Sequence, residues 1–220
     1  MGGDNIVTAG MKLETARFCL RPLTAADDTA AFRRWMADTA IVHPMNLPPR
    51  DLSPAQVAQY WASRDNRHNF FFGIFSRDGK AAGFYEVEYE PLHAKASFTI
   101  GIDAGFRRQA IVEETATALF DWLFGPMATQ KIVALTLPAN QGFRAIMRDG
   151  GFIEEAVLKD EVRSLIGEGR LDQIRIGLTP AQWKSGRQNF QKNISRKAAA
   201  HAADISTQKD RDHASQSSAR

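Results

Sequence analysis

Hydrophobic and polar residues alternate with two different periods along residues 13–183, and these periods predict a mixed α/β fold. Alternating or continuous apolar runs predict strands at 17–23, 70–75, 81–90, 96–103, 131–137, 153–162 and 170–178. Apolar residues at helical spacing predict helices at 23–36, 53–64, 111–124 and 140–152. Because the early strands follow one another and helices intervene later, we expect a mostly antiparallel sheet of six to seven strands, flanked by helices.

Capping and turn residues mark several boundaries of these elements. Ser53, with Pro54 at the first helical position, predicts the start of a helix. The Asp78–Gly79 pair between two apolar runs predicts a hairpin turn. The proline-punctuated segment 40–51 is expected to be a loop.

The two ends of the chain differ in composition from the segment between them. We expect residues 1–12 to be flexible, and residues 184–220, which are polar and rich in Ser and Gln, to be largely disordered. A short helix near residues 197–203 is compatible with this expectation. The tail is either a solvated extension or a weak contact site for nucleic acid or a partner protein.

Composition and charge exclude several classes of protein. The chain has 220 residues, 44% of them hydrophobic, enough for one domain with a sizeable core. No run approaches the roughly 18 apolar residues of a membrane span, and the N-terminus lacks a secretory pattern. Cys19 is the only cysteine and the five histidines lack metal-ligand spacing, so we expect no disulfide and no metal. These features predict a cytoplasmic protein.

The basic character of the chain belongs to its tail. From Lys184 onward there are eight basic and three acidic residues, and subtracting these from totals of 28 and 25 leaves 20 basic and 22 acidic residues before it. A nucleic-acid-binding domain usually carries its basic surface in the folded part. Nucleic acid is therefore not an expected partner of the domain.

The stretch GFRRQAIVEE, residues 105–114, is typical of a loop that enters a helix N-terminus, where proteins bind phosphate groups. Arg107, Arg108 and Gln109 provide guanidinium and amide donors suited to phosphate oxygens. Glycine usually occupies the places where such a loop approaches its ligand, whereas this loop has Ala110 and Val112.

Four pieces of the sequence, in this order, resemble the GCN5-related N-acetyltransferase (GNAT) superfamily, and most of all its branch of ribosomal-protein N-terminal acetyltransferases. The opening LETARFCLRPLTAADD is similar to the first strand and helix entry of that branch. The stretch GFRRQAIVEETATALFDWLF matches the acetyl-CoA loop and helix in length. Asn140 lies eleven residues before the Gly151–Phe152 pair, and Asp172 in the last strand is followed by LTPAQW. The resemblance covers residues 13–183.

The resemblance implies a GNAT fold in which two central strands splay apart and acetyl-CoA, or another acyl-CoA, lies between them. It implies that the pantetheine arm pairs with the backbone of strand 96–103 and that the loop 107–112 holds the pyrophosphate. Asn140 contacts the cofactor chain in relatives, and its alternative role is to cap the following helix. The implied cofactor-binding residues are Gly101, Ile102, Arg107, Arg108, Gln109, Ala110, Ile111, Val112 and Asn140.

Several positions depart from the family pattern. The family loop reads Gln/Arg-x-x-Gly-x-Gly/Ala, and Ala110 costs on the order of 1–2 kcal/mol if its backbone is left-handed. Many relatives have a glutamate base where this chain has Ser97. The serine or tyrosine acid of relatives corresponds to Phe143 or Met147, which cannot donate a proton to a thiolate.

A replacement base is available in the motif EVEYE, in which Glu86, Glu88 and Glu90 share one face of a strand. In the implied fold this strand borders the acceptor cleft, and the alternative is a solvated outer face. The candidate catalytic residues are Glu88, Glu86 and Ser97, with Glu88 the most central of the glutamates.

Two functions follow from these expectations. The first is an N-acyltransferase that transfers an acetyl or other acyl group from acyl-CoA to a primary amine by direct attack, the acceptor being a small molecule or a protein N-terminus. The second is a catalytically impaired module of the same fold that binds CoA or a partner and serves in protein interaction or regulation. A homodimer is compatible with either function.

Overall fold

The computed structural model describes residues 11–217 of the chain, and it places the side chains of residues 11–199. The strands are β1 (Leu13–Glu14), β2 (Phe18–Pro22), β3 (Asn69–Ser76), β4 (Ala81–Glu90), β5 (Lys95–Ile102), β6 (Lys131–Thr136), β7 (Ile153–Arg163) and β8 (Arg170–Leu178). The α-helices are α1 (Ala30–Ala37), α2 (Thr39–Val42), α3 (Pro54–Ala62), α4 (Ile111–Phe124), α5 (Gln141–Asp149) and α6 (Pro180–Ser217). Short 3₁₀ helices are η1 (His43–Met45), η2 (Pro91–His93) and η3 (Ala104–Phe106). Of the segment 1–12, which the sequence predicts to be flexible, residues 1–10 lie outside the described residues.

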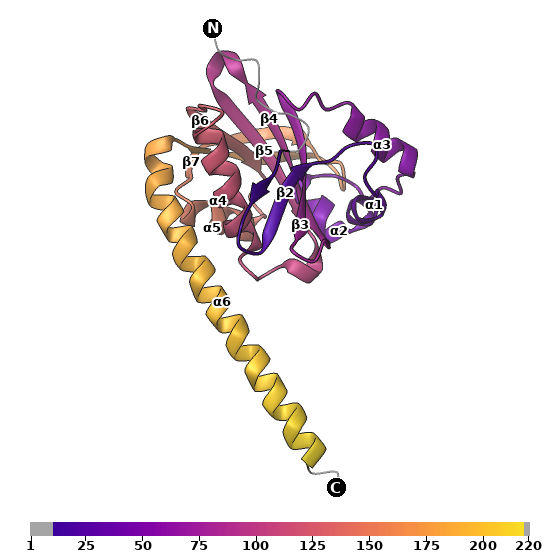
Figure 1. Ribbon diagram of the computed structural model, residues 1–220. Coiled ribbons are helices and arrows are strands. Elements are labelled where there is room, and N and C mark those ends of the chain that lie inside the picture. Colours follow the sequence, from indigo (N-terminus) through magenta and orange to yellow (C-terminus); the bar gives the residue numbers. More distant parts are fainter. Residues whose placement is uncertain (1–10, 218–220) are drawn as a thin grey trace.

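One sheet of eight strands runs through the described residues in the order β1-β2-β3-β4-β5-β6-β8-β7 (Figure 1). All neighbours pair antiparallel except β5 and β6, which are parallel. The mixed α/β architecture and the mostly antiparallel sheet are therefore confirmed. The sheet exceeds the expected six or seven strands because β1, with only two residues, is too short to produce a period in the sequence.

The parallel pair β5 and β6 splays apart after three residues. Register partners run from Lys95 opposite Lys131 to Ser97 opposite Val133, although β5 continues to Ile102. Beyond this point each strand has a backbone edge without a neighbouring strand among residues 11–217. Such an edge is available to a ligand with amide groups. The splay implied by the family resemblance is confirmed.

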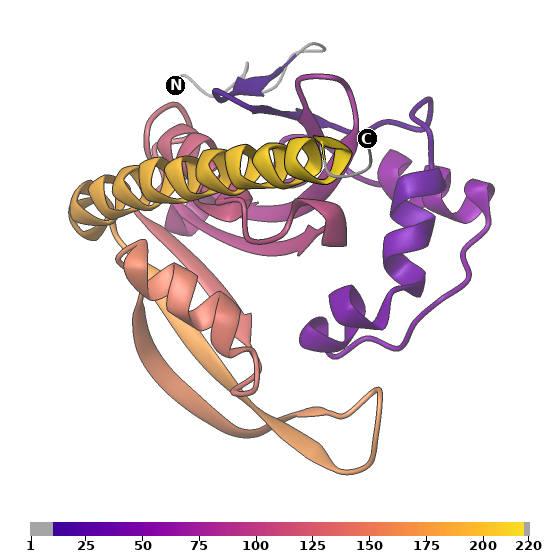
Figure 2. The same ribbon diagram turned by 90° about the horizontal axis from the view of Figure 1, so that it is seen from below.

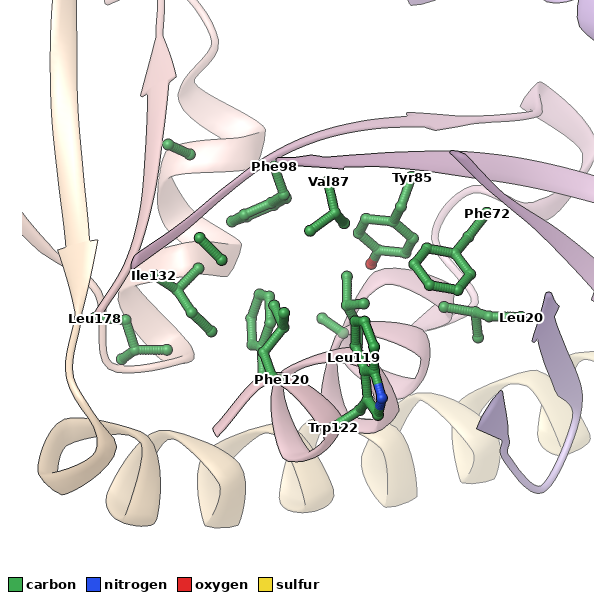
Figure 3. Packing of buried hydrophobic residues seen from close by; sticks show 14 of the residues in the cluster. Leu20, Phe72, Tyr85, Val87, Phe98, Leu119, Phe120, Trp122, Ile132 and Leu178 are labelled. Carbon is green, nitrogen blue, oxygen red and sulfur yellow. The ribbon is translucent and has the colours of Figure 1, made fainter. Parts of the chain in front are cut away.

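Helices cover both faces of the sheet, and the alternation of side chains decides which residues each face receives (Figure 2). The α4 face carries α4, α5 and α6, and its core packs residues such as Phe72, Tyr85 and Val87 against Leu119 and Phe120 of α4 (Figure 3). The opposite face, here called the α1 face, carries α1, α2 and α3. Its core combines helix residues with side chains of β3 and β4 that point the other way.

The first helix begins later than its pattern indicates. The expected helix at 23–36 starts only at Ala30, because the carboxylate of Asp27 accepts hydrogen bonds from the N–H and hydroxyl of Thr24, at 2.8 and 3.0 Å, and holds a turn there. The loop expected at 40–51 also contains α2 and η1. In contrast, α3 begins as expected, with Ser53 in a complete capping box.

Residues 184–217 are helical, whereas the sequence predicts that residues 184–220 are largely disordered. Helix α6 extends from Pro180 to Ser217 and projects beyond the rest of the domain (Figure 1). It is ordered against α4 because Trp183 and Phe190, seven residues apart on one helical face, are both buried in the α4-face core. Arg187 adds an ion pair to Asp121 at 2.9 Å. The burial of these two aromatic side chains thus stabilises the packing of α6 on the domain, although the segment contains few apolar residues.

No helix within residues 11–217 is both long and apolar enough to cross a membrane.

Candidate functional site

A pocket of about 580 Å³ opens where β5 and β6 diverge. Its walls include residues from both faces of the sheet, so it passes between the splayed strands and joins the α1 face to the α4 face. The lining residues are Pro44, Met45, Glu86, Glu88, Glu90, Lys95, Ser97, Phe98, Thr99, Ile100, Val133, Ala134, Leu135, Thr136, Asn140, Phe143, Leu158, Glu161, Gln173 and Arg175.

The α1-face half of the pocket contains the predicted catalytic residues. In the β4–β5 register Glu86 lies opposite Thr99, and Glu88 lies opposite Ser97. All four side chains therefore share one face, and all four residues line the pocket. The structure brings Glu86, Glu88 and Ser97 together. The sequence pattern predicts the shared face of the two glutamates, and the β4–β5 register adds Ser97 to it.

The three glutamates of this strand differ in their partners. Glu86 accepts a hydrogen bond from the Tyr60 hydroxyl at 2.9 Å and forms an ion pair with the Arg64 guanidinium at 2.8 Å. Burial, together with the negative charge of Glu86, raises the pKa of Tyr60 well above its usual value, so the phenol stays protonated. Glu90 forms an ion pair with Lys95 at 2.9 Å. Within residues 11–199, Glu88 has neither kind of partner. Its side chain is exposed, as is that of Glu90, whereas Glu86 is half-buried.

A contact between the N-terminal helices and the β7–β8 hairpin bounds the α1-face half of the pocket. The Asn46 side chain donates a hydrogen bond to the Arg163 carbonyl at 2.8 Å and accepts one from the Leu165 N–H at 3.0 Å. Asn46 also adopts a left-handed backbone with φ of 58°. Sequence reasoning missed this contact, and it missed Glu161 of β7 in the pocket wall. A single asparagine in a loop gives no periodic signal.

The α4-face half of the pocket contains Asn140. This residue precedes α5, but its side chain makes no capping hydrogen bond and instead lines the pocket. Phe143 packs beside Phe98, with ring centroids 6.1 Å apart, and forms an apolar wall. Met147 is buried in the core, so it supplies no proton donor.

The predicted phosphate loop contains two residues with left-handed backbone. Arg108 has φ of 64°, and Ala110, which precedes α4, has φ of 57°. The cost of about 1–2 kcal/mol for a left-handed alanine therefore applies. Val112 packs against the core, and its side chain is thereby directed inward. The first N–H groups of α4, beginning with Ile111, have no acceptor within the helix.

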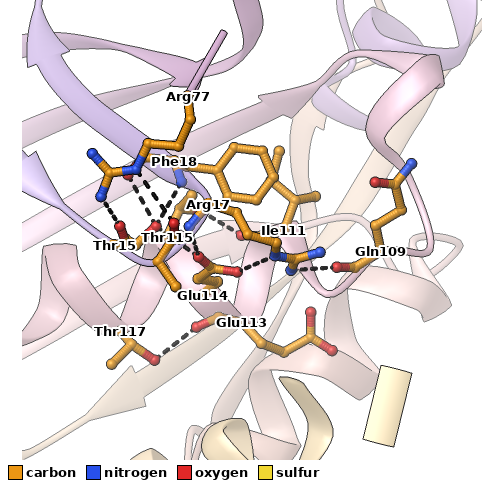
Figure 4. Close-up of polar contacts among 11 residues, drawn as sticks. Thr15, Arg17, Phe18, Arg77, Gln109, Ile111, Glu113, Glu114, Thr115 and Thr117 are labelled. Carbon is orange, nitrogen blue, oxygen red and sulfur yellow. Dashed lines mark hydrogen bonds and ion pairs between the residues drawn. The ribbon is translucent and has the colours of Figure 1, made fainter. Parts of the chain in front are cut away.

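Residues distant in the sequence hold this loop in place (Figure 4). The buried carboxylate of Glu114 accepts hydrogen bonds from the Thr15 hydroxyl, the Arg17 N–H and the Arg17 Nε, each at 2.7 Å. The Arg17 Nη2 also donates to the Gln109 carbonyl at 2.6 Å. These hydrogen bonds, here called the Arg17–Glu114 clamp, connect the segment between β1 and β2 with both the loop and the first turn of α4.

The side chains predicted to bind phosphate have different environments. Arg107 donates to the Ile102 carbonyl at 3.2 Å, and Gln109 donates to the Gly105 carbonyl at 3.0 Å, so both brace the loop itself. Arg108 is exposed. The loop and the last residues of β5, Gly101 and Ile102, do not line the pocket. The earlier part of β5 does line it, so this strand leads from the pocket to the loop. Gly101 also has a packing role, because a Cβ there would overlap the ring of Phe84.

Two basic side chains neutralise the two glutamates in the first turn of α4. Glu113 and Glu114 are both buried, and acidic residues in a first turn weaken the attraction of a helix N-terminus for anions. Glu114 forms an ion pair with Arg17, and Glu113 with Lys197 of α6. The exposed Arg108 then adds a positive charge to the loop.

Replacing Arg17 by alanine is expected to lower the free energy of unfolding by about 2 kcal/mol. Removing one partner of a buried ion pair costs about 3–5 kcal/mol, and the effect is smaller here because the Arg17 side chain is 35% exposed. Urea denaturation measures the change. Arg34→Ala, which removes a 62% exposed partner of Asp103, is the control and should cost less than about 0.5 kcal/mol. Equal losses in the two variants would contradict the clamp.

Comparisons with known proteins agree with this geometry. The family model described as acetyltransferase (GNAT) domain matches residues 17–153. A comparison with curated protein sequences gives no significant match.

Three solved structures illustrate the similarity of fold. Spermidine N-acetyltransferase from Vibrio cholerae, in complex with CoA and spermine, has a TM-score of 0.68 at 18% identity, over 76% of this chain and 98% of its own. A GCN5-related N-acetyltransferase from Brucella melitensis has a TM-score of 0.71 at 16% identity, over 84% and 86%. Ribosomal-protein-S5-alanine acetyltransferase from Vibrio fischeri has a TM-score of 0.67 at 15% identity, over 79% and 98%. The family model covers more than half of the chain, and the chain therefore belongs to the acetyltransferase (GNAT) family.

Proposed function

We propose that this protein is an N-acyltransferase that transfers an acetyl or other acyl group from acyl-CoA to a primary amine. The observation that carries the proposal is the pocket between β5 and β6, which has walls from both sheet faces. Two substrates can enter it from opposite faces and meet between the strands. Such an arrangement holds two reactants in a fixed relative orientation, which is a large part of catalysis for a direct transfer.

Acyl-CoA has a binding path along β5. The open edge of this strand, through Gly101 and Ile102, offers backbone groups to the amides of the pantetheine arm. The N–H groups of Ile111 and Val112, with the Arg108 guanidinium, are suited to the pyrophosphate. Asn140 offers an amide from the α4-face side of the pocket.

The amine acceptor has its place in the α1-face half of the pocket. Glu88 is suited to accept a proton from the incoming ammonium group, directly or through one water molecule held by Ser97. The free amine then attacks the thioester carbonyl carbon, the C–S bond breaks, and the thiolate leaves with the bonding electrons. The thiolate takes up the proton that the attacking nitrogen loses, directly or through water, which gives the amide and CoA. Glu86 is suited to a structural role, because its Oε1 atom already contacts both the Tyr60 hydroxyl and the Arg64 guanidinium.

Two acceptor classes fit this proposal. One solved neighbour is named for a small polyamine and another for a ribosomal protein. Glu86, Glu88, Glu90 and Glu161 outnumber the two basic residues of the pocket wall, which favours an acceptor that carries positive charge.

A second function is favoured by the residues at the acid positions. Phe143 and Met147 offer no proton to a leaving thiolate, and Ala110 keeps a strained backbone in the loop. These features favour a module that binds CoA, or a partner protein, without turnover. The two functions share the fold and differ in catalysis.

Binding and turnover are tested separately. Calorimetric titration with acetyl-CoA is expected to give a Kd at or below the high micromolar range, and thioester loss is then followed with polyamines, amino acids and N-terminal peptides. Turnover with any amine supports the transferase. Binding without turnover across the panel supports the module, and no binding at high micromolar acetyl-CoA would refute the transferase.

A further inference from the structure

Thr136, the last residue of β6, carries a buried hydroxyl group without a hydrogen-bond partner within residues 11–199. Its exposed fraction is 5%, and it lines the pocket between the splayed strands. Buried hydroxyl groups nearly always find a partner, since an unpaired one costs as much as a lost hydrogen bond. An unpaired donor in the wall of a pocket therefore points to a ligand.

The position of Thr136 identifies which substrate it faces. Along β6, Thr136 shares its face with Ile132 and Ala134, which belong to the α4-face core. It also lies beyond Val133, the last β6 residue paired with β5. The hydroxyl is therefore on the α4-face side of the open cleft, whereas the glutamates of β4 are on the α1 face.

The surroundings of Thr136 are mostly apolar. Phe98, Ala134 and Phe143 line the pocket on the α4-face side, and Asn140 is the other side-chain hydrogen-bond donor there. A hydrogen bond in such surroundings is stronger than one in water. The site suits a largely apolar chain that carries a few isolated acceptor atoms.

We propose that the Thr136 hydroxyl donates a hydrogen bond to the pantetheine arm of acyl-CoA, at a carbonyl oxygen or at the sulfur. This inference rests on the proposed function. It adds a residue of β6 that positions the pantetheine arm, separate from the loop 105–114 proposed to hold the pyrophosphate. The thioester end of that arm must lie between β5 and β6 to meet an amine from the α1 face. Thr136 holds the arm at this point. It supplies a hydroxyl group near the positions where relatives have serine or tyrosine and this chain has Phe143 and Met147.

Thr129 provides a matched control. It is 0% exposed, its hydroxyl also lacks a partner within residues 11–199, and it does not line the pocket. Replacing either threonine by valine keeps the shape of the side chain and removes the hydroxyl. A purely structural effect of an unpaired hydroxyl should therefore appear in both variants.

The test measures CoA binding by calorimetry and thermal unfolding of the free protein, for wild type, Thr136→Val, Thr136→Ser and Thr129→Val. We expect Thr136→Val to weaken CoA binding about fivefold to tenfold, while Thr136→Ser and Thr129→Val bind as wild type. The Tm of the free protein should stay level or rise in both valine variants, because an unpaired buried hydroxyl is removed.

Other outcomes would overturn the inference in distinguishable ways. Wild-type affinity in Thr136→Val, or equal weakening in Thr129→Val, would show that the hydroxyl does not bind the arm. A Tm of Thr136→Val several degrees below wild type would show that the hydroxyl already has a partner in the free protein. Absence of CoA binding by the wild type would instead refute the proposed function, and this inference with it.

Discussion

Replacing Glu88 by glutamine is expected to lower kcat/KM for amine acylation by about 10²–10⁴-fold, the usual contribution of a positioned base. Glutamine keeps the size of the side chain and cannot accept the ammonium proton. Glu88 lines the pocket opposite Ser97, and it is the β4 glutamate free of an ion pair within residues 11–199. Steady-state kinetics with the best amine of the panel measures the effect. Acetyl-CoA affinity should not change, because Glu88 lies on the acceptor side.

The neighbouring glutamates provide the comparison. Glu90→Gln removes a carboxylate from the same face of the same strand, but this carboxylate is already paired with Lys95. Glu86→Gln keeps an oxygen acceptor for Tyr60 but removes the negative charge paired with Arg64, so its effect should include some loss of stability. We expect both variants to retain more activity than Glu88→Gln. Equal losses in the three variants would mean that the acidic face acts as a whole and that Glu88 is not the base.

Replacing Phe190 by alanine is expected to lower the free energy of unfolding by about 3–5 kcal/mol, the usual loss for a buried phenylalanine. Phe190 of α6 is 0% exposed and contacts the Trp183 ring edge-on, with centroids 5.7 Å apart. Its ring also packs on Gly150 at the end of α5. Urea denaturation followed by circular dichroism measures the loss.

Gln191→Ala is the control for Phe190→Ala, because Gln191 is exposed and lies next to Phe190 on the same helix. This variant should change the free energy of unfolding by less than about 0.5 kcal/mol. A similarly small effect for Phe190→Ala would show that α6 does not pack on the domain. Loss of α6 packing should also weaken the Lys197–Glu113 ion pair at the first turn of α4. The loop 105–114, which we propose to hold acyl-CoA, would then lose part of its support.

Elements whose signals are local were predictable from the sequence. The capping box at Ser53 and the Asp78–Gly79 turn act within a few residues, and the apolar periods of β4 and α4 need no distant partner. Helix α6 was not predictable in this way. Its few apolar residues resemble those of a disordered tail until α4 provides a surface on which Trp183 and Phe190 are buried.

The loop 105–114 shows the same division at the level of the site. Its length and its place before a helix are properties of the sequence alone. Whether Arg107 binds phosphate or braces the Ile102 carbonyl depends on how β5 ends. The clamp by Arg17, 97 residues before Glu114, depends on the position of β2 beside α4.

The sequence by itself therefore indicated the family, through the resemblance of four of its pieces to known members. It also determined the order of most elements and the shared face of Glu86 and Glu88, because periodicity is read along the chain. Only the tertiary structure decided which of these carboxylates is free, since Tyr60 and Arg64 reach Glu86 from α3 and from the residues after it. It likewise decided that the Thr136 hydroxyl is buried without a partner at the open cleft. Hydrogen bonds and ion pairs form between residues that are close in space, and that proximity exists only once the sheet and its helices have packed.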